Sequence, residues 1–111
     1  MPIPGVHALN YLPVEADQAG DNSLVLGVGG SRVVVVAYVL TNGDNTNPVE
    51  VTFKDDLGPL TGPMFLRAGG SIVFPGRPEA PAFRASRGSD VVLELSAAAP
   101  VAGHVTFLLT E

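Results

Sequence analysis

The spacing of glycine and proline constrains this chain more than any other feature. Thirteen glycines and ten prolines make up more than a fifth of the 111 residues. They separate short runs of β-branched residues, and both residue types interrupt helices and mark turns. No stretch of ten or more residues shows helical apolar spacing without a glycine or a proline. We therefore expect strands joined by turns rather than helices.

The apolar runs predict eight or nine strands, with turns at roughly 8–12-residue intervals, a spacing typical of a sandwich, jelly roll or barrel. We expect one all-β domain over residues 1–111, an antiparallel β-sandwich or jelly-roll-like fold of about eight strands. Met1–Gly5 is predicted to be an extended N-terminal arm because two prolines restrict its backbone. The polar segment 15–22 is predicted to be a loop. The expected strands are 6–14, 23–28, 32–41, 48–55, 60–66 (interrupted by Gly62 and Pro63), 71–74, 82–85, 90–96 and 101–110.

The run Arg32–Thr41 is the strongest strand prediction, and it is apolar on both faces. Strict alternation places Val33, Val35, Ala37 and Val39 on one face. A strand that is apolar on both sides is buried on both sides. One face is therefore expected to meet the core and the other a neighbouring subunit. The candidate interface residues of the second face are Val34, Val36, Tyr38 and Leu40.

The composition also indicates that this chain contacts other protein subunits. Hydrophobic residues make up 46% of the chain and charged residues 15%, against about 25% charged residues in typical soluble domains. A small core cannot hold that apolar surplus, so an oligomer or larger assembly is expected to cover it. The longest apolar run, Val33–Leu40, is far shorter than the ~20 residues of a membrane helix. A net charge of −5 with six scattered basic residues disfavours a nucleic-acid partner.

Catalytic and cofactor motifs are weak, and we expect no enzyme activity and no cofactor. The chain has no cysteine. Gly27–Ser31 (GVGGS) lacks the lysine and the following helix of a phosphate-binding loop, and Gly88–Asp90 does not have the form of a nucleophile elbow. His7, His104 and Glu50 are a minimal possible metal set, although surface or interface packing is favoured for His104.

Two further groups are candidate interface residues. Arg77, Arg84 and Arg87 fall within eleven residues, and arginine forks pair readily with carboxylates of a partner. A solvated loop face is the equally good alternative for them. Met1, Pro2, Ile3 and Pro4 of the arm are expected to add reach or to pair with the sheet edge of a neighbour.

Several local patterns resemble small structural proteins of tailed bacteriophages, in particular capsid decoration (cement) proteins. They are LTGP at Leu60–Pro63, the glycine pair Gly69–Gly70 before a short strand, an aromatic–small–Ser–x–Gly step at Phe83–Gly88, and LSAAAPVAGHVTF at Leu95–Phe107. The resemblance runs from Val33 to the C-terminus. It carries no active site to this chain.

The resemblance implies a non-enzymatic virion protein that binds the outer capsid surface as an oligomer, often a homotrimer, and stabilises the shell. The implied partners are further copies of the chain and the major capsid protein, without nucleic acid or membrane. The implied location is the virion, after synthesis in the host bacterial cytoplasm. Two alternatives stay open: a tail, baseplate or head-fibre component, and a jelly-roll carbohydrate-binding module. The absence of tryptophan and the presence of only two tyrosines disfavour the sugar-binding module.

Overall fold

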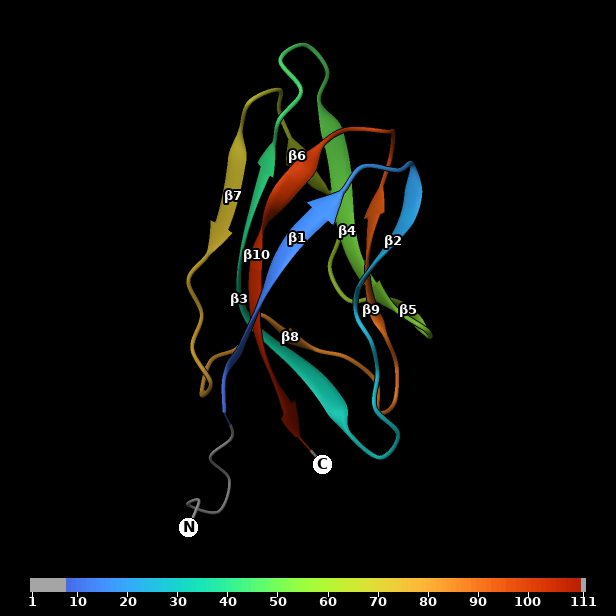
Figure 1. The fold of residues 1–111 in the computed structure, drawn as a ribbon, viewed down its shortest axis with the longest axis vertical. Coiled ribbons are helices and arrows are strands. Elements are labelled where there is room, and N and C mark those ends of the chain that lie inside the picture. Colours follow the sequence, from blue (N-terminus) through green and yellow to red (C-terminus); the bar gives the residue numbers. More distant parts are fainter. Residues whose placement is uncertain (1–7, 111) are drawn as a thin grey trace.

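Ten antiparallel strands form two five-stranded sheets that pack face to face, and the described residues contain no helix (Figure 1). The structure is a computed structural model, and it describes residues 8–110. The predicted all-β sandwich is confirmed. The predicted arm, Met1–Gly5, lies outside the described residues. The strands are β1 (Asn10–Ala16), β2 (Gly20–Val25), β3 (Arg32–Asn42), β4 (Val49–Asp55), β5 (Gly58–Pro59), β6 (Met64–Leu66), β7 (Ser71–Phe74), β8 (Phe83–Arg84), β9 (Val91–Leu95) and β10 (Val101–Thr110).

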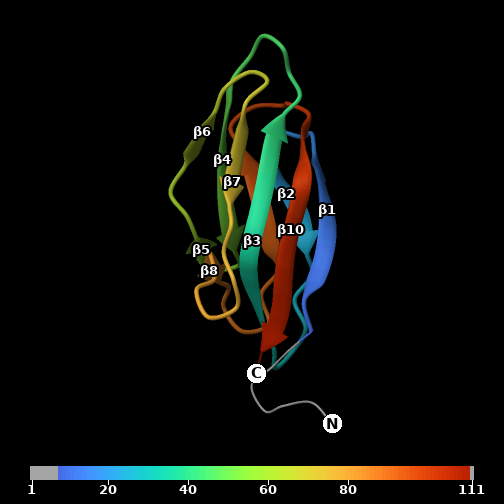
Figure 2. The ribbon, with the colours of Figure 1, turned by 90° about the vertical axis from the view of Figure 1, so that its left-hand side faces the viewer.

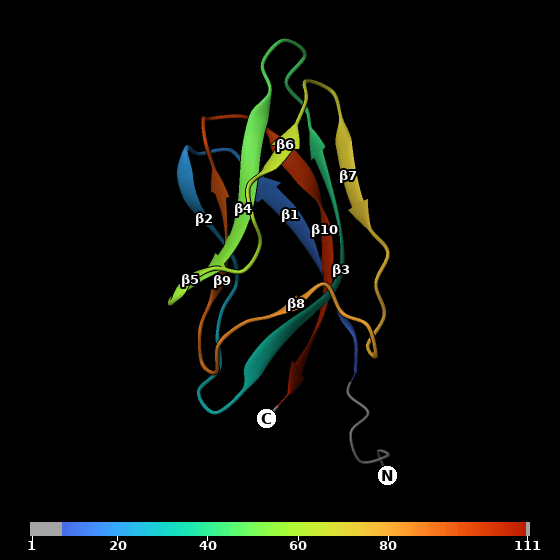
Figure 3. The ribbon, with the colours of Figure 1, turned by 180° about the vertical axis from the view of Figure 1, so that it is seen from behind.

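The chain crosses repeatedly between the two sheets. Sheet A has the order β1-β10-β3-β7, with β8 also paired to β3 (Figure 2). Sheet B has the order β2-β9-β4-β5, with β6 also paired to β4 (Figure 3). The first and last strands are neighbours, with Asn10 opposite Phe107 and Ala16 opposite Val101. Both ends of the described chain are therefore held in sheet A.

The core lies between the sheets and follows the predicted alternation in most strands. Val49, Val51 and Phe53 of β4 are almost completely buried, as predicted, while the residues between them face outwards. The Phe53 ring lies 4.9 Å from the rings of both Tyr38 and Phe83, centroid to centroid. Tilted aromatic pairs of this kind add about 0.5–1.5 kcal/mol each beyond burial. This aromatic cluster joins strands of both sheets.

The predicted loop 15–22 is partly wrong, because its two ends belong to strands. Glu15 and Ala16 complete β1, and Gly20 begins β2. Side-chain hydrogen bonds support this polar start of β2: the Asn22 Nδ2 donates to the carbonyls of Gln18 and Leu93, at 2.9 and 3.2 Å. These bonds stabilise the start of a strand whose sequence lacks the apolar alternation typical of strands.

The predicted faces of β3 are also wrong, because β3 contains a β-bulge. Thr106 of β10 lies opposite Ala37 and Phe107 lies opposite Val35, so Val36 has no partner on β10. An extra residue reverses the alternation beyond it. As a result, Tyr38 and Leu40 point into the core between the sheets, on the same side as Val33 and Val35.

Candidate interaction surface

The outer face of sheet A is the broad surface on which the register gathers mostly uncharged side chains. Its residues come from four adjacent strands (Figure 2). Among them, the Tyr11 and Val73 side chains are strongly exposed, at 72% and 60%. Only Glu15 and His104 can carry a charge. The outer face of sheet A comprises Tyr11, Pro13, Glu15, Ala37, Val39, Thr41, Ser71, Val73, Ala102, His104 and Thr106.

The outer face of sheet B has the opposite character. The Lys54 Nζ lies 3.0 Å from an Asp21 carboxylate oxygen and 3.4 Å from one of Glu94. The hydrogen bond to Asp21, helped by the two negative charges, raises the pKa of Lys54 against the opposing effect of desolvation. Glu50 lies on the same face, opposite Phe65. These charged groups keep sheet B well solvated, so the two sides of the sandwich differ chemically.

The predicted interface set on β3 does not form one surface. Val34 and Val36 are buried with Leu108 in a small cluster separate from the main core. Tyr38 and Leu40 belong to the main core. The prediction that these four residues share a face is therefore wrong, and the bulge at Val36 is the cause. The residues of β3 that reach the outer face instead are Ala37, Val39 and Thr41.

The three arginines have different surroundings. Arg77 sits in a tight turn paired with Ala80, and its Nε lies 3.8 Å from an exposed Glu79 carboxylate. Arg84 is exposed on β8. The Arg87 Nη1 donates to the Gly30 carbonyl at 3.0 Å. Arg87 therefore has a local structural contact. Met1, Pro2, Ile3 and Pro4 lie outside the described residues.

The possible metal set is not brought together. His104 is exposed on the outer face of sheet A, as its predicted outward position requires, whereas Glu50 lies on the outer face of sheet B. The thickness of the sandwich separates these two side chains. His7 lies outside the described residues. Between residues 8 and 110, no group of three or more histidine, aspartate or glutamate side chains could hold a metal ion.

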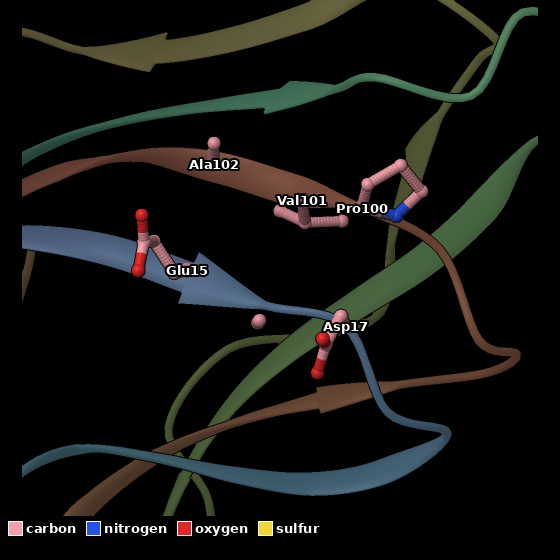
Figure 4. Close-up of a pocket in the computed structure, with 6 residues that line it drawn as sticks. Glu15, Asp17, Pro100, Val101 and Ala102 are labelled. Atoms are coloured by element: carbon pink, nitrogen blue, oxygen red, sulfur yellow. The ribbon is translucent and has the colours of Figure 1, made fainter.

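A shallow hollow of about 300 Å³ lies where β1 ends beside the start of β10 (Figure 4). It is lined by Glu15, Ala16, Asp17 and the segment 100–102. The carboxylates of Glu15 and Asp17 do not converge on one point (Figure 4). The described arrangement therefore offers neither a paired-carboxylate site nor a cation cage at this hollow.

The sequence prediction missed Tyr11 and Val73, the most exposed apolar residues of the outer face of sheet A. The alternation of segments 6–14 and 71–74 was a usable signal, but the outward face had to be known first.

No helix within residues 8–110 is long and apolar enough to span a membrane. No protein-family model matches this chain, and no curated protein matches it either.

Proposed function

We propose that this chain is a non-enzymatic structural protein of a virus particle. In this proposal it is a head decoration protein that binds the outer surface of the major capsid protein and stabilises the shell. It acts as an oligomer of identical chains, a homotrimer in the arrangement that its resemblance to cement proteins implies. Its location is the virion surface.

One observation carries the proposal: the outer face of sheet A is a nearly uncharged sheet surface on a chain with a net charge of −5. Protein interfaces are depleted of charged residues at their centre and enriched in aromatic residues. Val39 and His104 lie near the middle of this face, and Tyr11 and Val73 lie on its outermost strands. Sheet B, by contrast, carries a lysine paired with two carboxylates. This asymmetry favours sheet A as the side that meets other proteins.

The size of the face favours an assembly with several contacts. Four strands about 4.8 Å apart and about seven residues long present roughly 400 Å², which is half of the ~800 Å² that each partner buries in a standard interface. One such contact is therefore weak by itself. A particle surface offers many neighbouring sites, and multiple contacts raise the overall affinity.

The decisive experiment is a reconstruction of the virus particle whose genome encodes this chain. We expect density for the sandwich on the outer capsid surface, with sheet A turned towards the shell or a neighbouring copy. Density in the tail, baseplate or a head fibre would support the alternative virion location. Absence of the chain from purified particles would contradict every virion role.

Matched variants test which face binds. Val73→Asp places a charge on the outer face of sheet A, and Phe65→Asp does the same on sheet B, at a side chain of similar exposure, 65% against 60%. We expect Val73→Asp to weaken association with capsids at least about tenfold, equivalent to ~1.4 kcal/mol. Phe65→Asp should leave association unchanged. Equal effects of the two variants in a binding titration would exclude a specific role for sheet A.

A further inference from the structure

The edge of sheet A at β7 is open to solvent. Between residues 8 and 110, β7 pairs only with β3, with Thr41 opposite Ser71. β7 forms the outer margin of the molecule in two opposite views (Figure 1, Figure 3). The Val73 and Phe74 side chains are 60% and 37% exposed. The strand contains neither a proline nor a charged residue, so it presents an uncharged, largely apolar sheet edge.

The other sheet edges of the described chain carry features that discourage strand pairing. Pro13 stands at the centre of β1, and proline has no amide hydrogen to donate. The edge of sheet B at β2 carries Asp21, whose carboxylate is paired with Lys54. On the opposite side of sheet B, β5 and β6 have only two and three residues. Proline, charges and short strands all protect exposed edges. β7 is also short, but it lacks the first two protections, so it is the edge most open to an added strand.

The ladder between β3 and β7 determines which backbone groups of β7 face outwards. The Asn42 amide donates to the carbonyl of Gly70, one residue before β7 begins, at 2.9 Å. Hydrogen-bonded and non-hydrogen-bonded positions alternate along an antiparallel ladder. Ile72 therefore directs its amide and carbonyl towards β3, whereas Ser71 and Val73 direct theirs away from it. These outward groups are the donors and acceptors that an added strand uses.

We propose that the β7 edge pairs with the β7 edge of a second copy of this chain, antiparallel and about a two-fold axis at Ile72. Opposite residues of an antiparallel pair have side chains on the same face, so the outer-face residues Ser71 and Val73 must meet outer-face residues. An axis at Ile72 places Ser71 opposite Val73 of the second copy, and this pair exchanges both N–H···O bonds. The symmetry repeats these bonds on the other side of the axis. An axis at Val73 would instead place Ser71 opposite Pro75, which has no amide to donate.

This pairing continues sheet A across two molecules and joins their outer faces into one surface. Each copy presents roughly 400 Å², so two copies present roughly 800 Å², the area that each partner buries in a standard interface. The contact between two short strands is weak by itself, and the joined face binds a partner as one unit. The pairing does not depend on the virion role. In a decoration protein it would link neighbouring homotrimers, because a two-fold and a threefold contact can use different surfaces of one chain.

Cysteine trapping tests the register, because the chain contains no cysteine of its own. At the axis, the two Ile72 residues form a non-hydrogen-bonded pair with a Cα–Cα distance of about 4.5 Å, which a disulfide can bridge. The two Ser71 residues lie on the diagonal, about 7–8 Å apart, at or beyond the limit for a disulfide. We expect Ile72→Cys to form a disulfide-linked dimer under mild oxidation at least about ten times faster than Ser71→Cys. Non-reducing electrophoresis measures both rates. Equal rates, or no dimer with Ile72→Cys, would contradict the pairing.

A second pair of variants leaves the half-buried position 72 unchanged. Val73→Pro removes an outward amide and keeps the bonds to β3, whereas Val73→Thr keeps the amide and a β-branched shape. Sedimentation of the purified chain over a range of concentrations should show a dimer for the wild type and for Val73→Thr. The dimer dissociation constant of Val73→Pro should be at least about tenfold higher. A wild-type chain that stays monomeric up to millimolar concentration, or equal constants for the two variants, would overturn the proposal. No capsid is present in this experiment, so its failure would leave the virion role to the particle reconstruction.

Discussion

At the scale of single residues, Asp55 is the most buried charged group of the described chain. It is 7% exposed at the end of β4. Its two carboxylate oxygens accept hydrogen bonds from the backbone amides of Ser86, at 2.7 Å, and Leu57, at 2.9 Å. Burial alone would raise the pKa of Asp55, but the hydrogen bonds from Ser86, Leu57 and Gly58 together outweigh burial and lower it. The carboxylate therefore holds two loops in place in its charged form.

Asp55→Asn should destabilise the domain by about 2 kcal/mol at neutral pH, because a neutral amide accepts more weakly and turns a donor towards one of the two amides. A lowered folded-state pKa means that the unfolded state binds the proton first as the pH falls. The benefit of Asp55 is complete above its ordinary pKa of about 3.9 and disappears as the pH drops through the lower folded value. Urea unfolding from pH 7 to pH 2 measures this effect.

The difference between wild type and Asp55→Asn should shrink at the acid end of that series. Asp44 also has a lowered pKa, owing to hydrogen bonds from the backbone of Thr46 and Asn47, but it is present in both proteins and cancels. A difference that stays constant down to pH 2 would show that the charge of Asp55 is not what stabilises the loops.

At the scale of elements, the close contact of β10 with β3 depends on Gly103. Its φ of +150° is rarely adopted by other residues, and a Cβ there would overlap the carbonyl oxygen of Val39. Gly103→Ala should cost about 2–3 kcal/mol through strain and separation of the strands. Gly62→Ala is the control, because a Cβ at Gly62 would meet no atom within 4 Å. Similar melting temperatures for the two variants would argue against a tight β3–β10 contact.

The bulge in β3 yields a second prediction at this scale. Val35 and Val39 are four residues apart, so strict alternation gives them the same face, but the bulge puts Val35 in the core and Val39 outside. Val35→Thr should cost about 1–3 kcal/mol, because it buries a hydroxyl. Val39→Thr should stay within about 0.5 kcal/mol. Equal losses of unfolding free energy would contradict the bulge.

At the scale of the whole molecule, strand pairing joins distant parts of the sequence. β1 pairs with β10, and β10 pairs with β3. Proteins dominated by such contacts fold in milliseconds to seconds, because loops must close before strands can pair. The main core contains residues of both sheets, which predicts one cooperative unfolding transition. Tyrosine fluorescence and far-ultraviolet circular dichroism in urea should therefore give coincident curves. Two separated transitions would show that the sheets unfold independently and that the single-domain prediction fails.

The sequence by itself determined the strand class, most strand positions and the inward residues of β4, β9 and β10. In those strands, alternating side chains report directly which face is buried. The segments 71–74 and 101–110 were predicted with the bounds that the structure has. Of the interrupted strand predicted over 60–66, only the part after Pro63 is a strand, β6, while β5 (Gly58–Pro59) lies before the predicted range.

Tertiary structure alone decided the faces of β3 and the start of β2. The bulge at Val36 exists only because β10 offers one fewer residue opposite β3, and no pattern within β3 records that mismatch. The polar start of β2 is supported by Asn22 bonding to Leu93, 71 residues away. The outer face of sheet A likewise combines residues of β1, β10, β3 and β7. A surface assembled from distant strands requires the register between them, which local patterns in a single chain do not contain.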